Sequence, residues 1–359
     1  MDTASLSRTC APVRARPSAS RAAPRRGSRP VWVRANRGDV VATTSDTTDA
    51  TRRTFVAGML AGAAALTGTP GFALAADSLS QRLERKDLSK PVFNKARPGP
   101  QVYPEWLEGT WMATASFEGY SFPSKTMNAK ALVKEPTVPG FQKLSIVYVP
   151  DVGSTQVRYP VRFARREPGG PVLEDRVFNL DAIVTAYLNQ GVGPTMTKRA
   201  VEAVEYDPSK DPNRTTVQLV PGVSVNAERI ELFANARESE LRESDGTFFC
   251  AEATRQVTLG YGRDYGQARV INTDYQHVWS YTPLYDGEEG ESRESGRPGR
   301  VKVSLSTAGY VQPSDALRLT AAPGPGGGAP VPQMGFAGSA AFEPAVLYSH
   351  AITLEREAP

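Results

Sequence analysis

Cysteine and histidine are nearly absent from this chain of 359 residues, which has two of each. Cys10 lies in an N-terminal stretch that we expect to be removed, so Cys250 has no partner for an intramolecular disulfide. The histidines are His277 and His350. A structural zinc site takes most of its ligands from cysteine and histidine, and the sequence has too few of them. We therefore expect no disulfide, no metal and no other cofactor.

Acidic residues are missing from residues 3–38, which contain nine arginines and are rich in Ala, Ser and Pro. This composition is typical of an organelle transit peptide, which we assign to residues 1–50. After residue 75 acidic residues slightly outnumber basic ones, so the formal charge of +4 comes from the N-terminal segment. The rest of the chain has no concentrated basic patch, and we expect no nucleic-acid partner.

Long apolar runs are also missing. The run that begins at Val56 is interrupted by glycines and is shorter than the ~20 residues that span a bilayer. It follows Arg52 and Arg53, and Ala73 and Ala75 supply the small residues that a signal peptidase reads. Residues 51–75 therefore resemble a signal for the twin-arginine translocase. After a transit peptide, such a signal predicts the chloroplast thylakoid lumen; a membrane anchor or a chance arginine pair is the alternative.

Catalytic signatures are absent as well. The sequence has no G-x-S-x-G, no glycine-rich phosphate loop and no H-E-x-x-H. Cys250 has no His or Lys beside it in sequence and is interpreted as a small buried residue. We name no catalytic residue. An isomerase or cyclase that acts on a lipid without a metal is kept as a third alternative.

What the sequence has in abundance is β-strand patterning. Residues 76–102 form a polar linker, and the stretch 103–357 is interpreted as one domain. One helix is expected in "LDAIVTAYLNQG", 180–191, where Gly191 can end it. Insertions near 286–299 and 321–341 are expected to be mobile. Strands are expected near 110–118, 126–134, 142–149, 157–166, 172–179, 200–206, 214–220, 223–234, 247–261, 268–284, 299–311 and 345–356.

Apolar and polar residues alternate strictly in several runs, and this pattern predicts the fold class. In "RVKVSLS", Val301, Val303 and Leu305 share one face while polar residues occupy the other. In "WMATASF", the residues from Trp111 to Phe117 alternate in the same way. Such strands have one buried and one wet face, as in antiparallel sheets. We predict an all-β, mainly antiparallel fold with one or two short helices, closed into a barrel that leaves no exposed edge.

The stretch "YPEWLEGTW", 103–111, predicts a short helical turn followed by a strand that contains a G-x-W motif. Lipocalin-like barrels begin in much this way, and in them a basic residue of the last strand covers the tryptophan ring. The last strand here is "AVLYSHAITLERE", and Arg356 is the candidate partner of Trp111. Alternatively, Trp111 is a core residue of another β fold.

Four stretches carry a wider resemblance: "YPEWLEGTW", "FFCAEATRQV" (248–257), "STAGYVQPSD" (306–315) and "YSHAITLERE" (348–357). They resemble an uncharacterised domain family of plant, algal and cyanobacterial proteins over roughly 103–357, apart from the insertions. The resemblance implies a lipocalin-like (calycin) fold and, for plastid members, the thylakoid lumen. It implies no catalytic residues.

The strand 273–283 places Tyr275, His277, Trp279 and Tyr281 on one face, which predicts either a cavity lining or a packed core. His350 shares a face with apolar residues, and it is either a core residue or a polar contact for a ligand.

Arg255 interrupts the face of Phe249, Ala251 and Ala253. If that face points inward, Arg255 could hold an anionic head group, whereas a structural ion pair or a bulge is the alternative.

Two functions of different classes remain open at this point. The first is binding of a small hydrophobic or amphipathic ligand, such as a lipid, quinone or pigment derivative, inside the barrel. The second is a non-enzymatic auxiliary or assembly factor that docks on a thylakoid membrane complex. We expect the twin-arginine translocase to be a partner during import.

Overall fold

The computed structural model describes residues 77–91, 97–153, 156–190, 198–224, 227–261, 268–285, 297–319 and 342–357. The targeting residues Arg52, Arg53, Ala73 and Ala75 lie outside the described residues. So do most of the two expected insertions, since 286–296 and 320–341 are not described.

The described residues form an all-β, antiparallel sheet, as predicted. Its strands follow the order β1-β4-β3-β2-β11-β10-β9-β8-β7-β6-β5. They are β1 (Val102–Tyr103), β2 (Gly109–Ser121), β3 (Gln156–Arg165), β4 (Val172–Glu174), β5 (Val201–Glu205), β6 (Arg214–Leu219), β7 (Arg229–Arg242), β8 (Thr247–Tyr261), β9 (Ala268–Leu284), β10 (Arg300–Tyr310) and β11 (Val346–Arg356).

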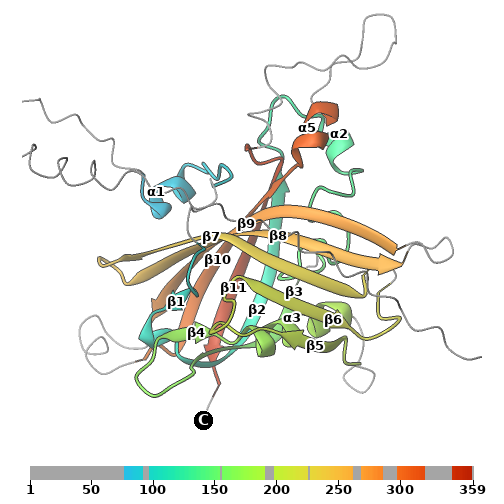
Figure 1. Ribbon diagram of the computed structural model, residues 1–359. Coiled ribbons are helices and arrows are strands. Elements are labelled where there is room, and N and C mark those ends of the chain that lie inside the picture. The colour runs from blue at the N-terminus through green and yellow to red at the C-terminus, as the bar shows by residue number, and fades with distance from the viewer. Residues whose placement is uncertain are drawn as a thin grey trace, which may run out of the picture. The chain divides into compact units, whose positions relative to one another are not determined.

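The sheet curls into a half-barrel (Figure 1). A closed barrel is not confirmed, because β1 and β5 stand at the two ends of the strand order within the described ranges. The helix α3 (Arg176–Leu188) contacts both β3 and β5, strands that lie far apart in that order. It therefore packs between the two arms of the sheet.

The helices of the described residues are few and short, although they are more than the one or two predicted. Besides α3 they are α1 (Leu79–Glu84), η1 (Glu105–Leu107), α2 (Ala129–Leu132) and α5 (Pro313–Leu319). The predicted helix at 180–191 is α3, which begins earlier because the Asp175 side chain accepts a hydrogen bond from the Phe178 N–H and caps its N-terminus. None of the helices in the described ranges has the length and apolar content needed to cross a membrane.

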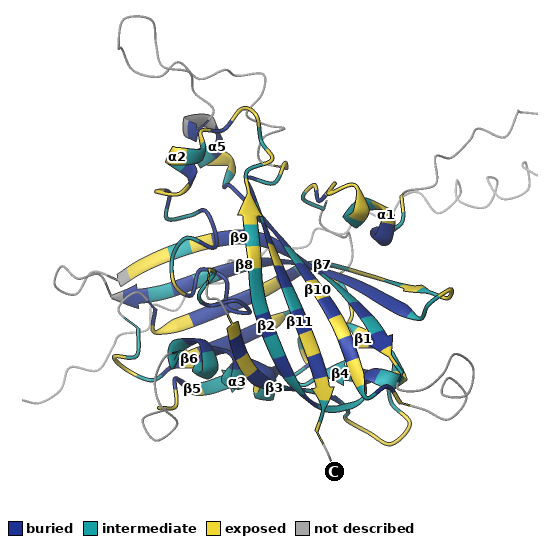
Figure 2. Ribbon diagram, turned by 180° about the vertical axis from the view of Figure 1, so that it is seen from behind, coloured by how far each residue is buried: buried dark blue, intermediate teal, exposed yellow. Residues whose placement is uncertain are grey.

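The inner face of the sheet carries the larger of two hydrophobic clusters. Alternation along β10 and β11 places Val301, Val303, Leu305, Ile352 and Leu354 inward, and Figure 2 shows buried and exposed residues alternating on these strands. The alternation predicted for 300–306 is confirmed. These positions supply the apolar part of the interior.

Four predicted strands are wrong, shortened or displaced. The strand predicted at 172–179 ends at Glu174, because α3 begins at Arg176. Residues 126–134 contain α2, and β7 begins at Arg229 instead of residue 223. Residues 142–149 form turns within loop 134–153, although Leu144, Ile146 and Val147 are fully buried or nearly so. Inner-face side chains satisfy the loop backbone, because Gln256 donates to the Leu144 carbonyl and accepts from the Val147 N–H. An apolar run therefore marked burial here without a strand.

The expected polar linker includes a segment packed on the outer face. Leu79 and Leu88 join a second hydrophobic cluster with Phe249, Ala251 and Tyr310. In that segment, α1 is closed by a capping box in which Ser78 and Gln81 exchange hydrogen bonds.

Candidate functional site

A cavity of about 60 Å³ lies inside the half-barrel, lined by β1 to β4, β9 to β11, α3 and loop 134–153. Aromatic side chains form much of its wall, including Tyr103, Tyr148, Tyr159, Phe163, Trp279 and Tyr281. Such a volume has room for a few water molecules, and it is smaller than the ~150 Å³ cavity that holds benzene in an engineered protein core.

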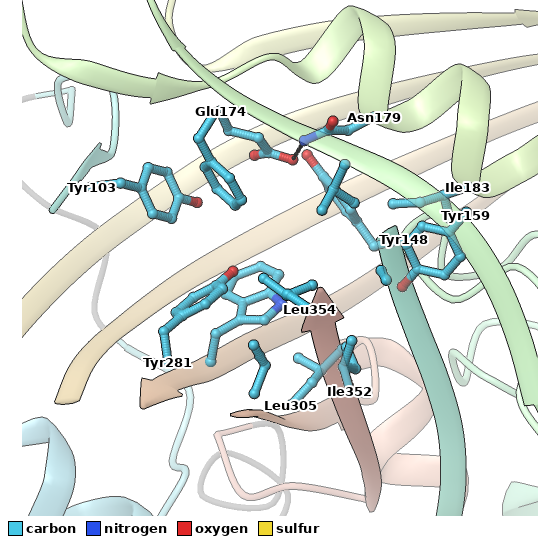
Figure 3. Close-up of a pocket in the computed structure, with 15 residues that line it drawn as sticks. Tyr103, Tyr148, Tyr159, Glu174, Asn179, Ile183, Tyr281, Leu305, Ile352 and Leu354 are labelled. Atoms are coloured by element: carbon cyan, nitrogen blue, oxygen red, sulfur yellow. Dashed lines mark hydrogen bonds between the residues drawn. The ribbon is translucent and has the colours of Figure 1, made fainter. Parts of the chain in front are cut away.

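The cavity has an apolar and a polar side. Figure 3 shows Leu305, Ile352 and Leu354 together on one side and Glu174 and Asn179 on the other. Asn179 Nδ2 donates to Glu174 Oε1 over 3.4 Å. The polar side is thus made by β4 and the first turns of α3.

A buried cluster of charges extends from Glu174. Glu252 on β8 accepts a hydrogen bond of 2.5 Å from Arg176 Nη2 and a second from Arg237 Nε. Arg176 Nε also lies 3.4 Å from Glu174 Oε2. The side chains of Arg176, Arg237 and Glu252 are each between 4% and 6% exposed, so the cluster is shut off from water.

The two carboxyl groups of this cluster differ in acidity. Burial alone would raise the pKa of Glu252, but the guanidinium groups of Arg176 and Arg237 outweigh it and hold the pKa at about 2. For Glu174, burial is the largest effect and raises the pKa, the attraction of Arg176 opposes it, and the charge of Glu252 adds to it. The same cluster therefore lowers the pKa of one carboxyl group and raises that of the other.

Tyr148 contributes a hydroxyl to the same cavity from loop 134–153. Its Oη is buried and has no hydrogen-bond partner among the described residues. Buried hydroxyls almost always have a partner. This one is therefore a free polar group at a cavity wall.

The aromatic residues predicted on β9 are all inside the half-barrel. Trp279 and Tyr281 line the cavity, whereas Tyr275 and His277 are buried beside it and do not line it. The His277 ring lies 5.0 Å from that of Trp279 and 5.8 Å from that of Tyr148. Burial lowers the pKa of His277 to about 3, and its Nδ1 is 2.8 Å from Thr307 Oγ1.

His350 is buried on β11, where its ring packs against Phe117 at 5.2 Å. Burial lowers its pKa to about 4. The Nδ1 of His350 and the Nε2 of His277 are buried and have no hydrogen-bond partner in the described part of the chain. Neither histidine reaches the cavity described above.

Arg356 lies over Trp111, with its guanidinium carbon 4.1 Å from the ring centroid. Arg356 also donates to the carbonyls of Trp106 and Glu108, and the Trp111 indole donates to the Leu107 carbonyl. Gly109 has a φ of 133°, and a Cβ there would come 2.7 Å from Arg356 Nη1. The glycine of G-x-W therefore leaves room for the arginine, and the group joins β2, β11 and η1.

Arg255 corrects an expectation. Its face, with Phe249 and Ala251, is the outer face, which packs against the N-terminal segment. Arg255 forms two hydrogen bonds to Asp274, of 2.8 and 2.9 Å, and Lys90 contacts the same carboxylate. Both faces of β8 are buried, so alternation could not tell which one pointed inward. Arg255 thus takes part in the ion pair that was the alternative.

The polar side of the cavity was not predicted from the sequence. Glu174, Asn179 and Tyr148 come from a short strand, a helix and a loop, and no local pattern connects them. One usable signal was Glu252, a lone acid within the run from Phe248 to Ala253. In the described residues, no group of three His, Cys, Asp or Glu side chains could hold a metal ion.

These features define a class: an all-β protein whose antiparallel half-barrel encloses a small aromatic cavity beside a buried cluster of two arginines and two acids. The chain belongs to the family described as a domain of unknown function (DUF6816), whose model matches residues 96–326. No curated protein and no solved structure matches the chain.

Proposed function

We propose that this protein binds a small amphipathic molecule inside the half-barrel. The observation that carries the proposal is the cavity, in which Leu305, Ile352 and Leu354 face Glu174, with the unpartnered Tyr148 hydroxyl in the wall. Ligand sites combine a mostly apolar lining with a few convergent polar groups in this way. A lipid, a quinone or a pigment derivative has the required apolar body and polar end.

The volume limits how such a ligand binds. Ligand pockets usually measure ~300–1,000 Å³, well above the 60 Å³ found here. The proposal therefore requires that only one end of the ligand enters, or that the cavity widens. The walls that can separate belong to α3 and loop 134–153, since neither is paired into the sheet.

The proposed place of action is the thylakoid lumen, and the proposed fold is a variant of the lipocalin-like barrel. The proposed localisation is based on the targeting residues Arg52, Arg53, Ala73 and Ala75. The fold proposal is supported by the half-barrel, by α3 between its arms and by Arg356 over Trp111. Replacing both arginines with lysine should stop lumenal maturation in chloroplast import, and normal maturation would contradict the address.

Native mass spectrometry of the protein isolated from thylakoids tests the ligand. We expect an added mass that is lost on denaturation. Ala113 lines the cavity, whereas Ala115 is buried two residues further on β2 and does not line it. Ala113→Val should lower the fraction of the protein that carries the added mass, and Ala115→Val should leave that fraction unchanged. A bare polypeptide mass in the wild type, or equal effects of the two variants, would count against an interior ligand.

A second candidate is a factor that docks on a thylakoid membrane complex. The observation that favours it is a groove of about 650 Å³ between β3 and α3. In the described residues, β4 covers this edge of β3 only at residues 163–165. Unpaired strand edges can bind a further strand. Co-migration with a membrane complex on native gels, with no added mass, would favour this candidate.

A further inference from the structure

The polar side of the cavity offers particular chemistry to whatever enters it. Tyr148 Oη is buried, lies at the cavity wall and has no partner among the described residues. Figure 3 shows its hydroxyl end on the side of the cavity where Glu174 and Asn179 lie. A phenol hydroxyl can donate one hydrogen bond and accept others. An incoming group can therefore satisfy Tyr148 from within the cavity.

Glu174 also has spare hydrogen-bonding capacity. Its two carboxyl oxygens make contacts of 3.4 Å, one with Asn179 Nδ2 and one with Arg176 Nε, both longer than a normal hydrogen bond. Burial raises the pKa of Glu174. The ionised carboxyl group accepts hydrogen bonds, and the protonated one can also donate.

Among the described residues, neither arginine of the buried cluster is free to bind an anionic head group. Arg237 uses its donors on Glu252, Gly99, Asn213 and Pro212. Arg176 is held by Glu252 and lies beside Glu174, so an added negative charge would face two carboxyl groups. A cationic head group would in turn lie beside the buried charge of Arg176.

We infer that the polar end of the ligand is an uncharged hydroxyl or carbonyl group, held by Tyr148 and Glu174, while its apolar body packs on Leu305, Ile352 and Leu354. This inference rests on the proposed interior ligand site.

Four probes that share one ring separate the possibilities: phenol, toluene, benzoate and protonated benzylamine. Their dissociation constants for the full-length chain can be measured by ligand-observed NMR, with tryptophan fluorescence as a second signal. We expect phenol to bind about tenfold more tightly than toluene, because one added hydrogen bond is worth about that factor. Benzoate and benzylamine should bind more weakly than toluene.

Two variants locate the effect. Tyr148→Phe should weaken phenol binding and leave toluene binding unchanged, while Glu174 still offers phenol a hydrogen bond. Tyr187→Phe is the matched control, because Tyr187 is buried on α3 and does not line the cavity. Leu305→Ala enlarges the apolar side, so it admits a ring even if the wild-type cavity stays too small.

The outcomes distinguish the two claims. Equal binding of phenol and toluene, or an unchanged phenol preference in Tyr148→Phe, overturns the inference and leaves an interior site. Tightest binding of benzoate or benzylamine overturns it in favour of a charged head group. If no probe binds to the wild type or to Leu305→Ala, the interior ligand site itself is contradicted.

Discussion

Two buried carboxylates on the paired strands β8 and β9 face opposite sides of the sheet, and each is held by two cations. Glu252 faces inward and contacts Arg176 and Arg237. Asp274 faces outward and contacts Arg255 and Lys90. The inner guanidinium groups are 6% and 4% exposed, whereas Arg255 is 41% exposed and Lys90 13%. The two centres have the same chemistry and differ in their access to water.

Because of that difference, losing one partner should destabilise the protein more at the inner centre than at the outer one. If one partner of a fully buried cluster is lost, the remaining charges stay unpaired, whereas a half-exposed cation can turn to solvent. Burial alone would raise the pKa of Asp274, but Arg255 and Lys90 keep it below its ordinary value. The outer centre ties the N-terminal segment to the sheet. The inner centre determines the charge beside the cavity.

The largest loss of stability is expected when the inner anion, Glu252, is removed. Glu252→Gln keeps the shape but leaves Arg176 and Arg237 without their counter-ion, and should lower the free energy of unfolding by about 3–5 kcal/mol. Denaturant unfolding measures it. Asp274→Asn is the matched control on the outer face, and it should lower the free energy of unfolding by clearly less than Glu252→Gln does. Equal losses from the two variants would show that burial does not separate the centres.

The next largest effect on stability is expected from the two histidines, which are buried and form no ion pair within the described residues. Burial lowers the pKa of His350 to about 4 and of His277 to about 3, from 6.5. A lowered histidine pKa means that stability is complete above pH 6.5 and is lost as the pH falls toward the folded-state value. At pH 5 the loss should be about 2 kcal/mol for each histidine.

His350→Gln should therefore remove about half of the histidine-linked loss of stability between pH 7 and pH 5. Thermal or denaturant unfolding of both proteins across this range measures the difference. Because both proteins contain Glu174, its opposite pH dependence cancels in the comparison. A variant with the same pH dependence as the wild type would mean that His350 can be protonated inside the folded protein.

The smallest loss of stability is expected from a substitution on the outer face of the sheet. Arg255→Gln removes a half-exposed partner of Asp274, while Lys90 remains in place. We expect a loss of no more than about 1 kcal/mol, because exposed ion pairs are weak. The loss should shrink when the salt concentration is raised, since salt screens the pair. A loss as large as that of Glu252→Gln would refute the distinction between the faces.

Sequence reasoning succeeded where a strand has one wet face. On β10, Lys302 and Ser304 are exposed, so the inward set from Val301 to Leu305 could be recognised by period two. On β8 both Cys250 and Ala251 are buried, so the same rule could not choose a face and placed Arg255 wrongly. A strand was predicted at 142–149 because the run is apolar, yet this stretch forms turns whose backbone bonds to side chains of β8 and β9.

By itself the sequence determined the antiparallel all-β class, the short turn before Trp111 and the inward set of β10, because these depend on neighbours along the chain. Only the tertiary structure decided the rest. Glu252 meets Arg176 76 residues away, and the loop with Tyr148 fills the interior instead of extending the sheet. Contacts over such distances along the chain depend on how the sheet curls and on what packs inside it. Local periodicity predicts neither of these.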